Sequence, residues 1–414
     1  MKILNFGSCN IDCVYSVENI ACPGETVPAF GLEHFAGGKG LNQSIALARA
    51  GAKVFHAGCI GKDGQMLRKL LRDSGVNLKY LKTVEHSTGR AVIQVDAHGE
   101  NSILLYSGAN YAVTRDYIDE VLTDFSAGDF LLIQNEISEL PYLIERAYAA
   151  GMRIIFNPSP FQQTLRNIDL NQVSYLILNE IEAAGFSGLS EPEEFVIWSR
   201  MNYPDTRVIL TLGKNGSIYF DGQTRIKQSA FCVKAVDTTA AGDTFTGYFA
   251  AGILSGKSVE KSLRLASCAA AIAVSKNGAA PSVPAMEEVE ESLETMQLCA
   301  CSDTEQKKRT VKAYFENHLS DATLGGLAAQ LGYCPSYTGR WLKNNIGASF
   351  SELLLSARCR KLADLLKETE LCVSELIART GYNNESFIRK AFYREYGCTP
   401  LEYRKRKQDE KHDK

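Results

Sequence analysis

Short apolar runs alternate with stretches of helical periodicity through the first 284 residues of the chain. Between the runs, apolar residues recur every three or four positions, which predicts helices over Asn42–Ala50, Gln65–Asp73, Leu140–Ala149 and Thr244–Leu254. The runs themselves are rich in β-branched and aromatic residues, which predicts strands over Ile3–Phe6, Val54–Cys59, Phe130–Gln134, Arg153–Phe156, Tyr175–Leu178 and Val208–Leu212. Strands that alternate with helices predict a parallel sheet with helices on both faces.

Two segments break this alternation, Cys13–Phe35 and Gly89–Tyr106. The second has the pattern of a hairpin around His98-Gly99, and together the two segments predict a small antiparallel flap beside the main sheet. A Glu-rich helix over Met286–Met296 follows a Pro-containing end of the unit. We therefore expect a first domain at residues 1–295 and a polar linker at 296–305.

An internal repeat follows the linker. Residues 323–347 align with 372–397 at an offset of 49, which becomes 50 after one insertion. The alignment pairs Leu327 with Leu376, Gly332 with Gly381, Tyr333 with Tyr382, Arg340 with Arg389, and Gly347 with Gly397. In each copy a short helix ends at a Gly-containing turn before a second helix, which is typical of a helix-turn-helix unit. The repeat predicts an all-helical second domain at 306–406, with a charged tail at 407–414.

Charge divides the chain in the same way. The formal net charge is −3, yet residues 305–414 hold 20 basic and 14 acidic residues, so this end is basic and the remainder acidic. A basic domain favours contact with a polyanion, although a solvated basic helix face explains charge alone equally well. No run of about 18 apolar residues predicts a membrane span. Twelve cysteines without paired spacing and a polar N-terminus indicate a cytoplasmic protein.

The segment DTTAAGDTFTG, residues 237–247, combines small residues with a carboxylate at a strand-to-helix junction. Ala240, Ala241 and Gly242 allow a ligand to approach the backbone closely, and the first N–H groups of a helix bind anions. Asp243 beside such N–H groups suits a general base that takes a hydroxyl proton while phosphoryl charge is stabilised. A plain helix-capping aspartate is the structural alternative.

A second Gly-rich segment, AGGKGLNQS at 36–44, opens a predicted helix. It is not a phosphate-binding GxxxxGK[ST] loop, which the chain lacks. Asn42 in this segment, with Asn10 and Asp12 after the first strand, offers the paired donors and acceptors that each hydroxyl of a polyol requires. These segments together predict a sugar site.

Seven segments now carry a family resemblance, and they span residues 1–284 in that family's order and spacing. They are GSCNID, GGKGLNQS, GENSILLYSGAN, NEIE, TLGKNG, DTTAAGDTFTG and KNGAAPSVP. This part of the chain resembles the PfkB, or ribokinase-like, carbohydrate kinases. The resemblance implies an α/β fold, a Rossmann-like αβα core with a β-clasp lid, and ATP-dependent phosphorylation of a sugar hydroxymethyl group, with a pentose expected.

The resemblance also assigns residues. It implies that Asp243 is the base and that Gly242 and Ala241 form the anion hole. The implied sugar contacts are Asn10, Asp12, Gly38, Lys39, Asn42, Glu136 and Asp243. The implied nucleotide contacts are Asn179, Glu182, Thr211, Gly213, Gly216, Gly242 and Ser267. Ser267 departs from the His or Asn that relatives often carry beside the adenine, and for Glu136 a strand-end carboxylate in solvent remains the alternative.

Metal ions and assembly follow from the same resemblance. Glu182 is implied as an indirect Mg²⁺ contact. A K⁺ loop is implied, mostly through backbone carbonyls, at Asp237, Thr239, Ala273, Lys276, Gly278 and Ser282. Because a flap of few strands is marginal alone and leaves sheet edges to cover, and because relatives pair their lids, we expect a homodimer joined through the flap.

Residues 306–406 resemble the DNA-binding domain of AraC/XylS-type regulators, in which two helix-turn-helix units are joined by a long helix, here about Phe350–Lys367. The resemblance implies outward-facing DNA contacts at Ser336, Arg340, Glu385, Ser386, Arg389 and Lys390. The expected core residues are Tyr337, Trp341, Leu342, Phe387, Ile388, Ala391 and Phe392. Gly339 replaces the polar residue usual in the first unit, so the first helix is expected to read fewer bases of double-stranded DNA.

Three functions remain open on the sequence. The chain is an active sugar kinase that also binds DNA, a transcription regulator whose kinase fold senses sugar without turnover, or a kinase whose tail contacts proteins. The intact Asp243 favours the first hypothesis over the second, because a pure sensor tolerates loss of the base. The intact double helix-turn-helix argues against the third.

Overall fold

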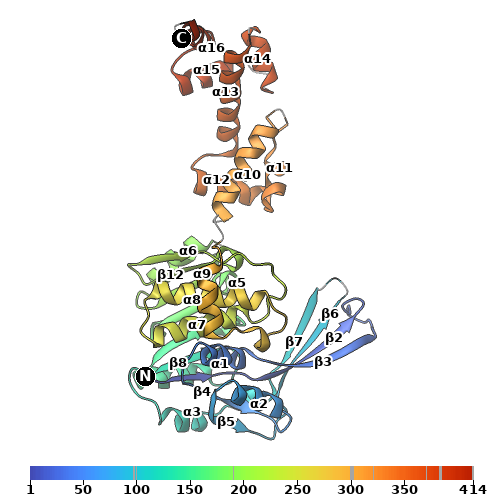
Figure 1. Ribbon diagram of the computed structural model, residues 1–414, viewed down its shortest axis with the longest axis vertical. Helices are drawn as coiled ribbons and strands as arrows, with labels where there is room; N and C mark the ends of the chain where they lie inside the picture. The colour runs from blue at the N-terminus through green and yellow to red at the C-terminus, as the bar shows by residue number, and fades with distance from the viewer. Residues whose placement is uncertain are drawn as a thin grey trace. The chain divides into compact units, whose positions relative to one another are not determined.

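The computed structural model describes residues 1–96, 98, 100–189, 191–298, 303–319, 321–369, 371–381 and 385–412, without the side chains of 193, 303–306, 309, 368, 387 and 407–412 (Figure 1). The chain divides into two compact units, Met1–Ala300 and Cys301–Lys414. The division lies within the predicted linker, of which residues 299–302 are outside the described part. The side chain of Phe387, Tyr382 of the repeat, the hairpin residue Gly99 and, in the charged tail, the side chains of 407–412 and all of residues 413–414 are also outside it.

The first unit is built on a nine-stranded sheet in the order β13-β12-β11-β10-β9-β8-β1-β4-β5. Its strands are β1 (Ile3–Phe6), β4 (Val54–Ile60), β5 (Asn77–Thr83), β8 (Phe130–Gln134), β9 (Arg153–Asn157), β10 (Tyr175–Asn179), β11 (Arg207–Thr211), β12 (Ser217–Phe220) and β13 (Arg225–Gln228). The six predicted strands are confirmed and lie parallel at the centre. The prediction of a wholly parallel sheet is wrong at one edge, where β12 and β13 pair antiparallel.

Helices cover both faces of this sheet, because neighbouring strand residues point to opposite sides. Leu132 belongs to a hydrophobic core shared with residues of α1, α2, α7 and α8, whereas Leu131 belongs to a second core, on the other face, shared with residues of α3, α4, α5 and α6. The helices are α1 (Lys39–Arg49), α2 (Gln65–Asp73), α3 (Arg115–Leu122), α4 (Leu140–Ala149), α5 (Glu180–Ser187), α6 (Pro192–Asn202), α7 (Ala241–Leu254), α8 (Val259–Val274) and α9 (Met286–Thr295).

The predicted flap is a separate four-stranded sheet in the order β3-β2-β6-β7, which projects from the main body of the first unit (Figure 1). Its strands are β2 (Asn10–Val17), β3 (Ala29–Gly37), β6 (Gly89–Val95) and β7 (Asn101–Tyr106). The flap is not wholly antiparallel as predicted, since β2 and β6 run parallel. Two predicted site residues lie at one end of the β2–β3 pair, since Asn10 begins β2 opposite Gly37 and Gly38 directly follows β3.

The second unit is helical throughout its described part. Its helices are α10 (Asp303–Asn317), α11 (Leu324–Leu331), α12 (Pro335–Ile346), α13 (Phe350–Glu368), α14 (Val373–Arg379), α15 (Glu385–Tyr396) and α16 (Pro400–His412). The two repeats form the pairs α11–α12 and α14–α15. The long helix α13 joins them, with Leu353 in the core of the first pair and Leu362 in that of the second. Among the described residues, no helix has the length and apolar composition that a membrane crossing needs.

Candidate active site

The starts of helices α1 and α7 meet at the centre of the site. The Asn42 Nδ2 donates to Oδ2 of Asp243 at 3.0 Å, and the Gln43 Nε2 donates to Oδ1 of the same carboxylate at 2.9 Å. All three side chains are buried. The predicted base therefore lies in a fixed orientation, with an amide donor on each of its oxygens.

The predicted anion hole is formed by the first turn of α7. Ala240 caps this helix at φ 58°, a left-handed conformation that costs a non-glycine residue about 1 kcal/mol and that clusters at functional sites. The amide of Ala241 donates to the Thr238 carbonyl at 3.3 Å. The amides of Gly242 and Asp243 follow it in the first turn, where no preceding helical carbonyl can accept from them. The sequence assigned the anion hole to Ala241 and Gly242, but because the Ala241 amide already donates to Thr238, the donors best placed to hold an anion are the amides of Gly242 and Asp243.

A cleft of about 240 Å³ opens in front of this turn. Its wall contains six of the predicted residues, namely Lys39, Asn179, Glu182, Thr211, Gly242 and Asp243. Predicted residues outside this wall include Asn10, Asp12, Gly38, Asn42, Glu136, Gly213, Gly216 and Ser267. The cleft therefore joins the predicted base to the predicted nucleotide contacts, at the carboxyl ends of parallel strands, where open α/β sheets bind ligands.

Lys39 and Glu136 lie together beside the base. The Glu136 Oε2 accepts from the backbone N of Lys39 at 3.1 Å and from the Ser8 hydroxyl. Burial alone would lower the pKa of the Lys39 ammonium, but surrounding carboxylates, Asp243 foremost, outweigh it and raise the pKa. Burial raises the pKa of Glu136, against the opposing charge of Lys39. Glu136 is thus partly enclosed and bonded rather than a free carboxylate in solvent.

Asn10 and Asp12 lie on β2, on the flap side of the site. The Asn10 Oδ1 accepts from the Asn110 Nδ2 at 2.7 Å, and the loop before α1 passes so close that a Cβ at Gly38 would crowd the Asn10 amide. Burial raises the pKa of Asp12 to about 7, and the nearby carboxylates of Glu136 and Asp243 act in the same direction. The flap therefore contributes a neutral amide and a carboxyl that titrates near neutral pH.

The predicted nucleotide contacts divide into two groups. Asn179 and Glu182 form a capping box at the start of α5, with reciprocal hydrogen bonds of 2.9 Å. Thr211 ends β11, and its hydroxyl donates to the Leu178 carbonyl at 3.3 Å. Gly213 and Gly216 follow, both at positive φ. A Cβ at Gly216 would collide with the backbone of Gln228, so close strand packing by itself requires this glycine.

Ser267 lies at a distance in sequence from these residues. It is buried on α8. Ser267 is not among the residues that line the cleft.

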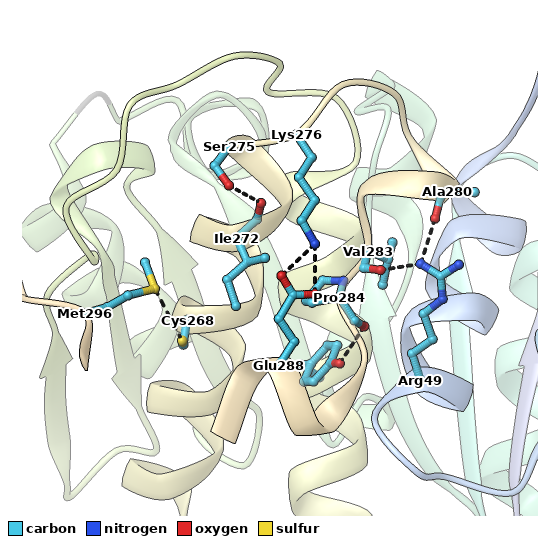
Figure 2. A network of polar contacts seen from close by, with 11 residues as sticks. Arg49, Cys268, Ile272, Ser275, Lys276, Ala280, Val283, Pro284, Glu288 and Met296 are labelled. Carbon is cyan, nitrogen blue, oxygen red and sulfur yellow. Dashed lines mark hydrogen bonds and ion pairs between the residues drawn. The ribbon is translucent and has the colours of Figure 1, made fainter. Parts of the chain in front are cut away.

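The predicted K⁺ loop has a single carboxylate at its centre. The Asp237 oxygens accept from the backbone N of Thr239 at 2.8 Å and of Gly278 at 3.0 Å. Although burial alone would raise the pKa of Asp237, these bonds lower it, so the carboxylate is anionic. The Lys276 ammonium does not neutralise it, because this ammonium donates to the two carboxylate oxygens of Glu288 on α9, at 2.7 and 2.8 Å (Figure 2). An anionic carboxylate that no lysine or arginine among the described residues pairs with would balance the charge of a monovalent cation.

The end of this loop is tied to the helices that carry the site. Arg49 on α1 donates to the carbonyls of Ala280, at 3.1 Å, and Val283 (Figure 2). The Tyr248 hydroxyl on α7 donates to the Pro284 carbonyl at 2.8 Å. Ser282, predicted to line the loop, is buried and donates its hydroxyl to the Ala279 carbonyl. Ala273 accepts from the amide of Lys276, which closes the loop at its start.

In the second unit, the predicted outward set lies on the surface of α12 and α15. Ser336, Arg340, Ser386 and Lys390 are exposed. The expected core residues Trp341, Leu342, Ile388 and Phe392 are buried. Arg389 differs from Arg340, because its Nε donates to the Glu385 carboxylate at 2.9 Å. In the described state, the second-unit arginine is therefore held by its own helix.

Four site residues were missed in the sequence. Gln43, Asn157, Ser8 and Asn110 all bond directly to predicted site residues or to one another. Ser8, Gln43 and Asn110 lie within three motif segments named above, GSCNID, GGKGLNQS and GENSILLYSGAN. Their position beside the predicted site residues of those motifs could therefore have identified them. Asn157 ends a plain apolar strand, and nothing in its neighbourhood marks it.

Comparison with known proteins identifies both units. Residues 1–286 match the sequence profile described as the pfkB family carbohydrate kinase. Residues 327–406 match a helix-turn-helix domain profile. These matches confirm the ribokinase-like fold of the first unit and the AraC/XylS-type helix-turn-helix of the second.

Individual relatives match the first unit over nearly their whole length. The ribokinase of Haemophilus influenzae is 37% identical over 298 residues, which cover 70% of this chain and 97% of that protein. The crystal structure of ribokinase from Cryptococcus neoformans in complex with ADP superimposes with a TM-score of 0.63 at 35% identity, over 70% of this chain and 99% of that one. Arabidopsis thaliana ribokinase, complexed with ribose and ATP, gives 0.63 at 31% identity over 71% and 98%.

Proposed function

The chain belongs to the pfkB family of carbohydrate kinases, and we propose that its substrate is ribose. It is an ATP-dependent carbohydrate kinase that also carries a helix-turn-helix domain. We propose in addition that this domain regulates transcription in response to ribose. The observation that supports turnover, rather than sensing alone, is the Asp243 carboxylate, which lies beside free first-turn amides with both oxygens bonded to α1. The preference for ribose rests on the ribokinase relatives, with deoxyribose as the second choice.

In this proposal Asp243 takes the proton of the sugar hydroxymethyl group as its oxygen attacks the terminal phosphoryl group. The amides of Gly242 and Asp243, with the ammonium of Lys39, stabilise the charge that moves onto the phosphoryl oxygens. Asn10, Asp12, Asn42 and Glu136 hold the remaining hydroxyls. The buried position of the base excludes water, which limits hydrolysis of ATP without sugar.

ATP is proposed to lie along the cleft from Gly242 to Thr211, with Mg²⁺ near Glu182. Glu182 and Asp243 both line the cleft, and their carboxylate oxygens are the kind of ligand that would hold a hard cation there. When bound, Mg²⁺ neutralises phosphate charge. K⁺ is proposed for the loop around Asp237, where it balances an anionic carboxylate that no described lysine or arginine pairs with.

A homodimer is proposed through the flap. One face of this sheet carries exposed large apolar side chains, among them Phe30 at 74% and Leu104 at 69% of their maximal accessible area. Leu32 and Tyr106 are also exposed on this face, whereas Phe35, Ile103 and Leu105 alternate with them along the same strands and lie on the opposite face. Apolar side chains this numerous on a four-stranded sheet are typical of an interface. The proposed partner is the flap of a second copy of the chain, because an apolar face packs well against an identical apolar face and the open strand edges of two copies can pair with each other.

The second unit is proposed to bind double-stranded DNA through α12 and α15, with Ser336, Arg340, Arg389 and Lys390 as contacts. The exposed polar face of each helix, opposite a buried core face, supports this geometry. A cytoplasmic location is proposed, where both sugar and DNA are present. The target genes are proposed to serve uptake and use of the same sugar.

Two experiments test the proposal. An ATP-turnover screen across pentoses and hexoses should give the highest kcat/KM with ribose, and no turnover with any sugar would reduce the kinase fold to a sensor. Titration of a selected DNA site, with and without saturating ribose and a non-hydrolysable ATP analogue, should give different affinities. Superimposable curves would mean that the two units are only tethered.

A further inference from the structure

We infer that Gln43 is a positioning residue for Asp243, a role that rests on the base function proposed above. Gln43 is fully buried on α1, directly after Asn42. Its Nε2 carries two hydrogens and has two acceptors, Oδ1 of Asp243 at 2.9 Å and Oδ1 of Asn157 at 3.0 Å. Both N–H bonds of this amide are therefore committed, one of them to the base.

A row of buried amides holds Gln43 from the other side. The Gln134 Nε2 donates to Oε1 of Gln43 at 2.7 Å and to Oδ1 of Asn5 at 3.0 Å. The Asn5 Nδ2 in turn donates to the Gly40 carbonyl and to the Ser44 hydroxyl, both at 2.7 Å. The row runs from β8 through β1 to the start of α1, so it connects the base to the centre of the sheet.

The direction of every amide in the row is fixed by groups that can only accept. The Gly40 carbonyl requires the nitrogen of Asn5, and the Ile177 carbonyl requires the nitrogen of Asn157, which donates to it at 2.9 Å. If the Gln43 amide were reversed, its oxygen would face the Asp243 carboxylate and the Asn157 oxygen, and unpaired buried acceptors are costly. Only the described orientation pairs both amide hydrogens and the oxygen of Gln43, and among the described residues the Gln134 Oε1 is the one polar atom of the row left without a partner.

Gln43 and Asn42 then differ in what they do for the base. Asn42 is a proposed sugar contact, and its Oδ1 is buried without a partner in the described structure, so its bonds change when sugar arrives. The bonds of Gln43 are complete without a ligand. Gln43 therefore holds one oxygen of Asp243 in place through the reaction, and a displacement of about 1 Å in a reacting group costs on the order of 100-fold in rate.

The test is the substitution Gln43→Met, which keeps the length of the side chain and removes the hydrogen bonds. We expect kcat to fall about 10- to 100-fold, with KM for ribose and the calorimetric Kd within about two-fold of the parent, because only the chemical step uses the base. The control for lost stability is the remote substitution Thr206→Val, which removes a buried hydrogen bond to the Leu170 carbonyl. This variant should keep the parental kcat and KM. A rise in KM with unchanged kcat would overturn the role.

A double-mutant cycle separates positioning from a structural effect. In an Asp243→Asn background, Gln43→Met should lower the residual rate by less than two-fold, because the carboxylate it positions is gone. An equal loss in both backgrounds would mean that Gln43 acts only through the fold. If Gln43→Met does not fold, Gln43→Glu serves as the second variant. It keeps an acceptor for Gln134 and places a second carboxyl group against Asp243, so the two groups share a proton, the pKa of the base rises and kcat at neutral pH should again fall.

Failure of this inference is distinct from failure of the proposed function. A slow Asp243→Asn variant with a Gln43→Met variant at the parental kcat would remove the role of Gln43 and keep the base. An Asp243→Asn variant at the parental kcat would remove the base itself.

Discussion

Asn42 and Asp243 lie 201 residues apart in the chain, yet the amide of one donates to the carboxylate of the other at 3.0 Å. Each stands near the start of a helix, and the two helices pack side by side on one face of the sheet. The sugar-side segment and the phosphate-side segment are thus joined by a direct bond. This contact places a hydroxyl bound at Asn42 next to the proposed base.

Replacement of the base should separate binding from chemistry. Asp243→Asn keeps the size of the side chain and removes the proton acceptor, so kcat should fall by about 10²- to 10⁴-fold. The Kd for ribose, measured by calorimetry, should stay within a few-fold of the parent. A variant that turns over at the parental rate would exclude Asp243 as the base.

Sugar binding should depend on pH through Asp12, whose pKa is raised to about 7. Above that pH the carboxylate is ionised and accepts hydrogen bonds from sugar hydroxyls more strongly. Affinity for ribose should therefore rise as pH increases from about 6 to 8. In Asp12→Asn the affinity is expected to be weaker and independent of pH over this range, as measured by calorimetry.

The raised pKa of Asp12 also predicts that the stability of the sugar-free protein changes with pH in the direction opposite to the affinity for ribose. The folded protein retains a proton on Asp12 that the unfolded chain loses near its ordinary pKa of 3.8, so the free energy of unfolding falls as pH rises from about 4 to 7. At pH 8, without sugar, Asp12→Asn should be more stable than the parent by about 1–2 kcal/mol. At pH 4 the gain should disappear. Denaturant unfolding at the two pH values measures it, and an equal gain at both would contradict the pKa shift.

Disruption of the apolar flap face should dissociate the dimer. Leu104→Glu places a charge in the proposed interface, and light scattering at micromolar concentration should then report a monomer. Ile197→Glu on α6, a residue that is 63% exposed, is the matched control and should leave the dimer intact. A parent protein that is already monomeric would remove the interface.

Potassium should stimulate turnover through Asp237. Because the carboxylate is anionic and lacks a described cationic partner, we expect higher kcat in potassium than in sodium-only buffer. Asp237→Asn should reduce that difference to near unity. Equal rates of the parent in the two buffers would contradict a K⁺ loop.

The two neighbouring cations on α15 should contribute differently to DNA binding. Arg389 leaves Glu385 to reach a base edge, so Arg389→Ala should relax specificity at one position by about 1–3 kcal/mol. Lys390→Ala should weaken all sequences alike and reduce the salt dependence by about one contact. Arg379→Ala on α14, outside the predicted contact set, is the control. Fluorescence anisotropy with a selected DNA site and with single-base variants of it measures the affinity and sequence preference of each variant protein. An unaltered sequence preference in Arg389→Ala would exclude a base contact by Arg389.

Much of the architecture could be predicted from local sequence. Leu131 and Leu132 belong to an uninterrupted apolar run because a central parallel strand is buried on both faces. Two of the strands that were missed, β5 and β13, lie at the edges of the sheet, where water replaces a neighbouring strand and the sequence turns polar, and the third, β12, has only four residues. The hydrophobic pattern carries little information there.

The sequence by itself determined the two units, the central strands, the paired helix-turn-helix repeat and the motif residues, since each rests on spacing within a few dozen residues. Tertiary structure alone decided which motif residues touch. The amide row from Asn5 to Gln43 arises because neighbouring parallel strands bring distant residues together, across more than 100 residues of chain in the case of Asn5 and Gln134. Burial then favours the amide orientations that pair the most hydrogen-bonding groups, because an unpaired buried donor or acceptor is costly.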